Sequence, residues 1–338
     1  MIASRGRTWV LPNGELHWLA IPLKGHDHCS QFQSILLHNM ERAHRFRVLA
    51  VGGSSYISTT DDPNVVLKGY QIWEDGRRVL DYYEDPGIPQ TSGEEDMIRE
   101  AAIYQHLGNH PLILRFLGLA ELDPGIHSLQ LELAPLNNIR SYIKQHPNEP
   151  LPLGVRLRMA TDAARGLAYL HSKRVQYCDL SCRNLMLFDN FQVKLGDFGA
   201  ALIEGRDFPE TFCEEAQYEL PLRGRKFETR PARKRDIFAL GSAIYEITAW
   251  QRPWQGLGDD EVYEKYEKEE FPTVEGNMVG SIITSCWNEA YDTANQAVKD
   301  LEERFETLSV DKQDLMLHRT RSADGDGSKA SSRLATNM

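Results

Sequence analysis

The sequence has no long uninterrupted apolar stretch, and none of its apolar runs approaches the roughly 20 residues that a helix needs to cross a bilayer. We therefore expect no membrane insertion. The five cysteines are odd in number and scattered, which excludes a disulfide framework and is typical of a reducing compartment. The first residues lack a compact apolar run after their basic start, so we predict no secretory signal and expect a cytoplasmic or nuclear protein.

The chain also lacks an excess of positive charge, because 49 acidic side chains stand against 38 basic ones and the net charge is -11. A nucleic-acid binder or a protein of anionic membrane surfaces needs a basic face, so we expect neither partner. The composition, 41% hydrophobic and 26% charged, is that of a folded globular protein and excludes a wholly disordered chain. The 338 residues allow one large domain or two smaller ones.

The pattern along the chain divides it into four stretches. Residues 1–44 have no sustained period, and we leave this N-terminal extension unassigned. Residues 45–135 are typical of short strands with one helix, and residues 138–305 are mainly helical. Residues 306–338 are polar, which predicts a disordered tail.

Within these stretches the pattern predicts individual elements. Ser92 and Glu95 form a capping box, and the apolar residues after it recur at helical spacing. The apolar patterns also predict helices over 154–171 and 237–250. Strands are predicted over residues 46–51, 65–68, 129–133, 184–187 and 192–195.

The most informative segment is 175–199, VQYCDLSCRNLMLFDNFQVKLGDFG. It contains Asp179, then Asn184 five residues later, and then Asp197, which opens Asp-Phe-Gly. A predicted hairpin lies between the last two, so that these oxygen-bearing side chains would gather around one small space. Magnesium prefers carboxylate, amide and phosphate oxygens, so Asn184 and Asp197 suit a Mg²⁺ site. Asp179 would then remain free to orient an attacking hydroxyl.

This segment resembles the catalytic loop and DFG motif of eukaryotic protein kinases, and the resemblance extends over residues 46–300. Further family motifs follow in order, namely VVLK at 65–68, NHPLILRFLG at 109–118, LQLELAPLNNIRSYI at 129–143, DIFALG at 236–241, QRPW at 251–254 and CW at 286–287. The resemblance implies an α+β, bilobal fold in one domain over 45–305. A small β-rich N-lobe with the αC helix would cover 45–133, and a larger, mainly helical C-lobe 138–305.

The resemblance also implies roles for individual residues. Lys68 would hold the α- and β-phosphates of ATP, and Glu100 would pair with this lysine. Asp179 would accept the proton of the substrate hydroxyl or orient it, while Asn184 and Asp197 would bind Mg²⁺. The remaining nucleotide contacts would come from the glycine loop, the adenine pocket, the gatekeeper, the hinge and the ribose site: Gly52, Gly53, Val66, Met186, Leu131, Glu132, Leu133, Ala134 and Asn138. For the last of these, capping of the next helix is an equally good interpretation.

Several positions depart from the family pattern. The phosphate-covering loop reads VGGSSYIS, and with only Gly52 and Gly53 it offers fewer backbone N–H groups that can approach phosphates, which predicts weaker nucleotide binding. Cys178 replaces the arginine that receives an activation-loop phosphate, and a thiol cannot make such bonds. We therefore expect that activation does not depend on phosphorylation of Thr211 or Tyr218 through that contact.

The end of the activation segment departs as well. Leu220-Pro221-Leu222 replaces the Ala-Pro-Glu motif, and Ala294 stands where the family has the arginine that pairs with its glutamate. Losing one end of a buried ion pair leaves an unpaired charge, whereas losing both ends can be nearly neutral. The matched loss predicts a folded, repacked C-lobe.

We expect an ATP-dependent protein kinase that transfers the γ-phosphoryl group to a protein hydroxyl. Arg183, four residues after Asp179, is typical of tyrosine kinases, and the lysine that serine/threonine kinases carry two residues after the aspartate is absent. The rest of the sequence resembles divergent (non-RD) protein kinases of filamentous fungi, for which serine/threonine transfer is the default. We expect serine/threonine transfer, and a tyrosine-directed kinase is one alternative. The other is a pseudokinase, a nucleotide-binding or scaffolding module, and the oligomeric state stays open.

Overall fold

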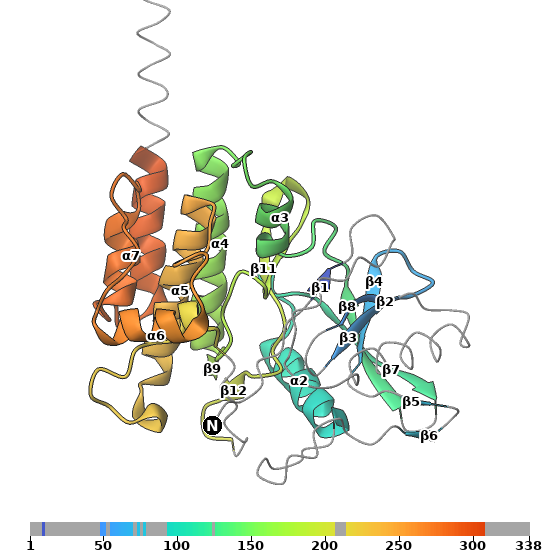
Figure 1. Cartoon of the computed structure of the whole chain (residues 1–338). Helices are drawn as coiled ribbons and strands as arrows, with labels where there is room; N and C mark the ends of the chain where they lie inside the picture. Colours follow the sequence, from blue (N-terminus) through green and yellow to red (C-terminus); the bar gives the residue numbers. More distant parts are fainter. Residues whose placement is uncertain are drawn as a thin grey trace, which may run out of the picture.

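The computed structural model describes residues 9–10, 48–51, 55–69, 73–74, 77–78, 93–123, 126–206 and 214–307. These residues form two lobes, a β-sheet with one helix and a larger helical lobe (Figure 1). The expected α+β, bilobal fold is confirmed. No helix within the described ranges is both long and apolar enough to span a membrane.

The N-lobe contains a six-stranded antiparallel sheet with the strand order β1-β2-β3-β4-β8-β7. Its strands are β1 (Trp9–Val10), β2 (Val48–Val51), β3 (Tyr56–Thr59), β4 (Val65–Gly69), β7 (Phe116–Asp123) and β8 (Ile126–Glu132). The pairing of β1 with β2 means that two residues of the unassigned N-terminal stretch belong to this sheet. A separate two-stranded ribbon forms from β5 (Trp73–Glu74) and β6 (Arg77–Arg78).

Helix α2 (Gly93–Leu107) packs against the sheet, as the helical spacing predicts. The apolar residues of its inner face are buried, namely Met97, Ala101, Ile103, Tyr104 and Leu107, whereas Ile98 on the other face is exposed. Ser92, the first residue of the predicted capping box, lies outside the described residues. The burial of this face fixes α2 on the sheet and thereby positions Glu100, which is also buried.

The C-lobe contains five labelled helices, and residues 294–307 are helical as well. The labelled ones are α3 (Ile139–Gln145), α4 (Leu153–Ser172), α5 (Ala232–Ala249), α6 (Asp259–Glu267) and α7 (Gly280–Trp287). Helix α5 is buried along most of its length, and Gly241 lets it approach α7, because a Cβ there would lie 2.6 Å from Cys286 Cβ. Residues 306 and 307, which the sequence assigned to the tail, belong to the last helix, and the rest of the predicted tail lies outside the described residues.

The segments between the lobes carry the motifs. The predicted hairpin consists of β10 (Leu185–Leu187) and β11 (Val193–Leu195), joined by the 3-10 turn η1 (Asp189–Phe191). Strand β9 (Val175–Gln176), which precedes the hairpin in the sequence, pairs with β12 (Leu202–Ile203), which follows it. The short helices η2 (Ala216–Tyr218) and η3 (Phe227–Thr229) follow, before α5.

Candidate active site

A buried ion cluster joins the two lobes at the predicted phosphate site. The ammonium of Lys68 on β4 lies 2.7 Å from Glu100 Oε2 and 2.6 Å from Asp197 Oδ1. Lys68 and Glu100 are both buried, whereas the side chain of Asp197 is 39% exposed. The Phe198 N–H donates to Glu100 Oε1 at 3.2 Å, so that α2 also holds the DFG segment. Three residues from β4, α2 and the segment after β11 therefore meet as the motifs predict.

The donor atoms around Asp197 suit a hard cation. Burial alone raises the pKa of this carboxyl, but the Lys68 ammonium overcomes that effect and the net pKa lies below its ordinary value, so the group is ionised. Asn184 donates both of its amide N–H bonds to Asp179, to the backbone carbonyl at 2.8 Å and to Oδ2 at 2.9 Å. Because both bonds use the amide nitrogen, the amide oxygen of Asn184 remains for a bound cation. The described residues contain no cluster of three or more His, Cys, Asp or Glu that could hold a metal alone. A carboxylate and an amide completed by phosphate oxygens are the donors that magnesium prefers.

Asp179 is held in place by its own loop. Besides the Asn184 amide, the Arg183 guanidinium lies 3.5 Å from Asp179 Oδ1. Burial raises the pKa of Asp179 well above its ordinary value; Arg183 opposes this rise, and the carboxylates of Asp197 and Glu215 add to it. A carboxyl with a raised pKa binds a proton more tightly than an ordinary aspartate does, which suits a group that receives one.

The backbone of the catalytic loop is fixed from below by α5. Asp236, which is 2% exposed, accepts hydrogen bonds from the N–H groups of Tyr177 at 2.9 Å and Cys178 at 3.0 Å. The His171 ring lies 2.9 Å from the same carboxylate. The loop needs this support because Cys178 has a φ of 62°, in the left-handed region that non-glycine residues rarely adopt. The ring of Tyr177 lies 5.4 Å from that of Phe198, so the catalytic loop packs against the DFG segment.

The predicted hinge offers one backbone donor to a ligand. The N–H of Glu132 donates to Arg115 O at 3.0 Å, and that of Leu133 donates to Asn64 O at 2.7 Å. The N–H of Ala134 has no hydrogen-bond partner in the described part of the chain. Of these three residues, Ala134 is thus the one whose amide is available to adenine.

The other predicted nucleotide contacts are placed as follows. Val66 on β4 and Leu131 on β8 are cross-strand neighbours and buried, and Met186 on β10 is half-buried. The Asn138 side-chain oxygen accepts from the Ser141 N–H at 2.8 Å, so Asn138 caps α3, one of the two interpretations that the sequence left open. Gly52 and Gly53 lie outside the described residues.

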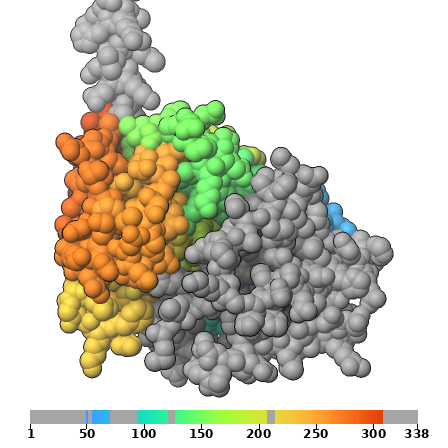
Figure 2. Space-filling model, viewed as in Figure 1, coloured from blue at the N-terminus to red at the C-terminus, as the bar shows by residue number. Residues whose placement is uncertain are grey.

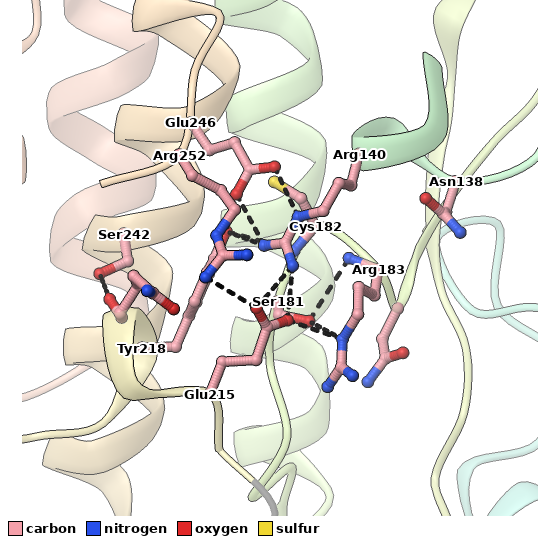
Figure 3. Close-up of polar contacts among 12 residues, drawn as sticks. Asn138, Arg140, Ser181, Cys182, Arg183, Glu215, Tyr218, Ser242, Glu246 and Arg252 are labelled. Carbon is pink, nitrogen blue, oxygen red and sulfur yellow. Dashed lines mark hydrogen bonds and ion pairs between the residues drawn. The ribbon is translucent and has the colours of Figure 1, made fainter. Parts of the chain in front are cut away.

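A buried charge network that the sequence did not predict lies beside this site (Figure 3). The Arg140 guanidinium on α3 donates to both Glu246 oxygens on α5, at 2.8 and 2.7 Å, and to both Glu215 oxygens at 2.6 Å. Arg183 contacts the same Glu215 carboxylate at 2.6 Å. Arg140 is 5% exposed and Glu246 is 1% exposed. The one sequence signal was Glu246, the only charged residue in the apolar part of α5 over 237–249, whereas Arg140 shares the short helix α3 with Lys144 and does not stand out.

Glu215 therefore fixes the activation segment to the catalytic loop through arginines. Its pKa is lowered to about 2, because the Arg140 and Arg183 cations outweigh the effect of burial, and the carboxylate is ionised at neutral pH. Tyr218 is fully buried, and its hydroxyl donates to Glu246 at 2.5 Å, so it is not accessible for phosphorylation in this structure. Thr211 lies outside the described residues.

In place of the family's Ala-Pro-Glu ion pair, the structure has an ion pair in which the two segments carry the opposite charges. Leu222 and Ala294 carry no charge, as the sequence requires, but Arg223 and Arg225 contact Glu289 at 2.7 and 2.6 Å. The end of the activation segment now supplies the cations and the segment after α7 supplies the carboxylate. The side chains of Arg223, Arg225 and Glu289 are 15–27% exposed, so this ion pair is partly buried. The repacking that the matched loss predicted is thus accompanied by a new ion pair.

A sheet with one helix, a lysine–glutamate pair between them, and a braced catalytic loop above a helical lobe together define the protein-kinase fold. The profile of the protein tyrosine and serine/threonine kinase family matches residues 88–301. The chain belongs to this family.

Curated relatives include kinases of both acceptor classes. The chain is 29% identical over 205 residues to the serine/threonine/tyrosine-protein kinase HT1 of Arabidopsis thaliana, a match that covers 58% of this chain and 50% of the relative. It is 26% identical over 230 residues to the mouse tyrosine-protein kinase ABL2 (65% of this chain, 19% of the relative). It is 28% identical over 207 residues to the Arabidopsis serine/threonine-protein kinase CTR1 (57% of this chain, 24% of the relative). The chain therefore spans half the length of one of these relatives and about a quarter or less of the others.

Proposed function

We propose that this protein is an ATP- and Mg²⁺-dependent protein kinase that transfers the γ-phosphoryl group to a hydroxyl of a protein substrate. The observation that carries the proposal is the buried contact of Lys68 with Glu100 and Asp197, next to an Asp179–Asn184 pair. A lysine between two carboxylates could also serve only to stabilise the fold. The neighbouring catalytic loop, with a carboxyl of raised pKa, favours chemistry over structure.

Each residue has a task that its surroundings suit. Lys68 would exchange one carboxylate contact for phosphate oxygens while Glu100 keeps its ammonium in place. Asp197 and Asn184 would hold Mg²⁺ through oxygen atoms. Asp179 would orient the substrate hydroxyl and receive its proton, with Arg183 restraining the carboxylate. When bound, ATP would supply the phosphoryl group and Mg²⁺ would neutralise the negative charge that develops during transfer.

Serine/threonine transfer is our proposal for the acceptor, and tyrosine is the alternative. The position of Arg183, within 3.5 Å of Asp179, supports the tyrosine alternative, since the sequence has this arginine where tyrosine kinases have it. Relatives of both classes are similar to the chain to about the same degree. The resemblance to non-RD kinases of filamentous fungi, which favours serine/threonine, stays a prediction. So do the domain boundaries at 45 and 305 and the cytoplasmic or nuclear location.

Thermal stability with nucleotide tests the first half of the proposal. Mg·ATP is expected to raise the unfolding temperature of the wild type, and ATP without metal to raise it less, because the two-glycine loop leaves more of the phosphate charge to the metal. Asp197→Asn should lose most of the metal-dependent part, whereas Asp292→Asn, an exposed carboxylate on the C-lobe, should keep it. No shift with any nucleotide, together with no phosphoryl transfer to peptide libraries, would favour the pseudokinase alternative.

A further inference from the structure

A second feature next to the proposed active site is a pocket of about 290 Å³ in the C-lobe. Arg140 and Lys144 line it from α3, Glu246 from α5, and Arg252 and Gln255 from the turn that follows α5. Ile143 and Leu257 contribute apolar walls. In Figure 2 the green surface of the C-lobe, which comes from α3 and α4, borders the orange surface of later segments.

The pocket carries more positive than negative charge. Its lining holds three cations, Arg140, Lys144 and Arg252, and one carboxylate, Glu246, and Glu215 behind it contributes a second carboxylate. No carboxylate of the described residues lies within ion-pair distance of Lys144. Burial lowers the pKa of Lys144, and the Arg140 and Arg252 cations lower it further. Glu246 and Glu215 oppose this lowering without reversing it, so an anion beside Lys144 would favour its charged form.

Arg252 adds an unused hydrogen-bond donor. Its Nε is buried and has no partner among the described residues, and its Nη2 lies 3.8 Å from Glu215. A buried donor without an acceptor is unfavourable, and a side-chain shift of Arg252 that turns this N–H toward an incoming oxyanion would satisfy it. The guanidinium is 33% exposed, so it remains reachable from solvent. In a chain of net charge -11, this local excess of cations is a specific feature and not a consequence of composition.

The pocket is connected to Asp179 by a short series of contacts, of which Figure 3 shows Arg140, Glu215 and Arg183. Arg140 contacts Glu215 at 2.6 Å, Arg183 contacts the same carboxylate at 2.6 Å, and Arg183 lies 3.5 Å from Asp179. Two side chains thus separate the pocket lining from Asp179. A polypeptide whose hydroxyl reaches Asp179 can place a nearby side chain in the pocket, since an extended chain covers about 3.5 Å per residue.

We propose that this basic pocket binds an anionic side chain, a carboxylate or a phosphate, of the polypeptide substrate, and so directs the protein to acidic sequences. This inference rests on the proposed kinase function and names the class of substrate. Guanidinium and ammonium groups are the side chains that bind carboxylate and phosphate oxygens by charge-assisted hydrogen bonds. The apolar walls would pack against the stem of the bound side chain.

Peptide binding tests the proposal without needing turnover. Two sets of labelled peptides have an uncharged background and one central acceptor, which is serine in the first set and tyrosine in the second. Each peptide carries a single Glu, which is moved through about five positions on each side of the acceptor, a reach set by the extended chain. Gln replaces Glu in the control set, and phosphoserine replaces it in a third. Affinities are measured by fluorescence anisotropy on the full chain with Mg²⁺ and a non-hydrolysable ATP analogue. We expect a Glu or phosphoserine peptide to bind about three- to tenfold more tightly than its Gln counterpart at low salt, and this ratio to shrink at high salt.

Variants assign the preference to the pocket. Lys144→Gln and Arg252→Gln should each reduce the Glu-to-Gln affinity ratio, the double variant should bring it to one, and Lys144→Glu should favour a Lys-bearing peptide. Lys299→Gln, at a lysine that is 76% exposed on the last helix, is the matched control and should keep the ratio. Phosphoserine preference without Glu preference would identify phosphate as the anion that binds. No anion preference at any position, or a preference that survives in the double variant, would overturn the proposal.

The two proposals fail separately. If peptides bind with the expected preference and no phosphate is transferred, the kinase function is wrong and the pocket stands. If phosphate is transferred without any preference for acidic peptides, the pocket assignment is wrong and the kinase function stands.

Discussion

Replacing Glu246 by Gln tests the buried charge network most sharply. The glutamate is 1% exposed and accepts two hydrogen bonds from Arg140, at 2.8 and 2.7 Å, and one from Tyr218 at 2.5 Å. Removing one partner of a buried ion pair costs about 3–5 kcal/mol, because the other charge remains buried. Glu215 still contacts Arg140 in the variant, so we expect the lower end of this range, about 3 kcal/mol.

Urea unfolding at pH 7 measures this cost. The matched control is Glu302→Gln, which removes the carboxylate of an ion pair whose side chains are 51% and 40% exposed. Exposed pairs contribute about 0–1 kcal/mol, so the control should be close to wild type. A double variant, Arg140→Met with Glu246→Leu, should lose less stability than the sum of the two single variants, because it leaves neither charge unpaired. Equal costs for Glu246→Gln and Glu302→Gln would refute the network's energetic role.

Three further predictions follow from the same contacts. Asp179 must be ionised to receive a proton and its pKa is raised, so kcat/KM should fall as the pH falls through that pKa. Arg183→Gln removes a cation and should move this acidic limb of the pH profile to higher pH, whereas Glu215→Gln removes a carboxylate and should move it to lower pH. Identical pH profiles for the wild type and both variants would contradict the role of Asp179. The folded pKa of Glu215, about 2, lies below its ordinary 4.5, so its stabilisation is present above pH 4.5 and is lost as the pH falls toward 2. The gap corresponds to about 3 kcal/mol, of which about 1.5 kcal/mol is gone at pH 3.5, so the stability difference between wild type and Glu215→Gln should narrow by that amount between pH 7 and 3.5 in urea unfolding. Asp236→Asn places an amide donor against a backbone N–H of the catalytic loop, and should cost about 2 kcal/mol of stability and lower kcat more than nucleotide affinity; an unchanged kcat would show that the loop does not need this support.

Residues that belong to contiguous motifs could be predicted from the sequence. Lys68, Asp179, Asn184 and Asp197 each stand in a short pattern whose spacing fixes their order, and the structure brings them together with Glu100. The αC-like helix and the central helix α5 were predicted because burial of one face, or of the whole helix, leaves a clear apolar pattern. Local chemistry determines these features.

Features that depend on distant residues could not be predicted. Arg140 is 106 residues from Glu246 and 75 from Glu215 along the chain. An arginine or a glutamate in a sequence does not indicate which distant residue it will contact. The reversed pair of Arg223 and Arg225 with Glu289 was missed for the same reason, because only the absence of the usual partners is visible in the sequence. Strand β3 was not predicted from the sequence either. It is only four residues long and half-buried residues alternate with buried ones along it, so its apolar pattern is weak.

Transfer of labelled γ-phosphate from ATP to a peptide tests the central claim most directly. The wild type and Asp179→Asn are compared on the same serine, threonine and tyrosine peptide libraries at saturating Mg²⁺, with Asp292→Asn as the exposed control. Both proteins should bind Mg·ATP, and the loss of the group that receives the proton should lower transfer by about 10²–10⁴-fold in Asp179→Asn alone. Transfer at wild-type rate by Asp179→Asn, or no transfer by any of the three proteins, would contradict the account.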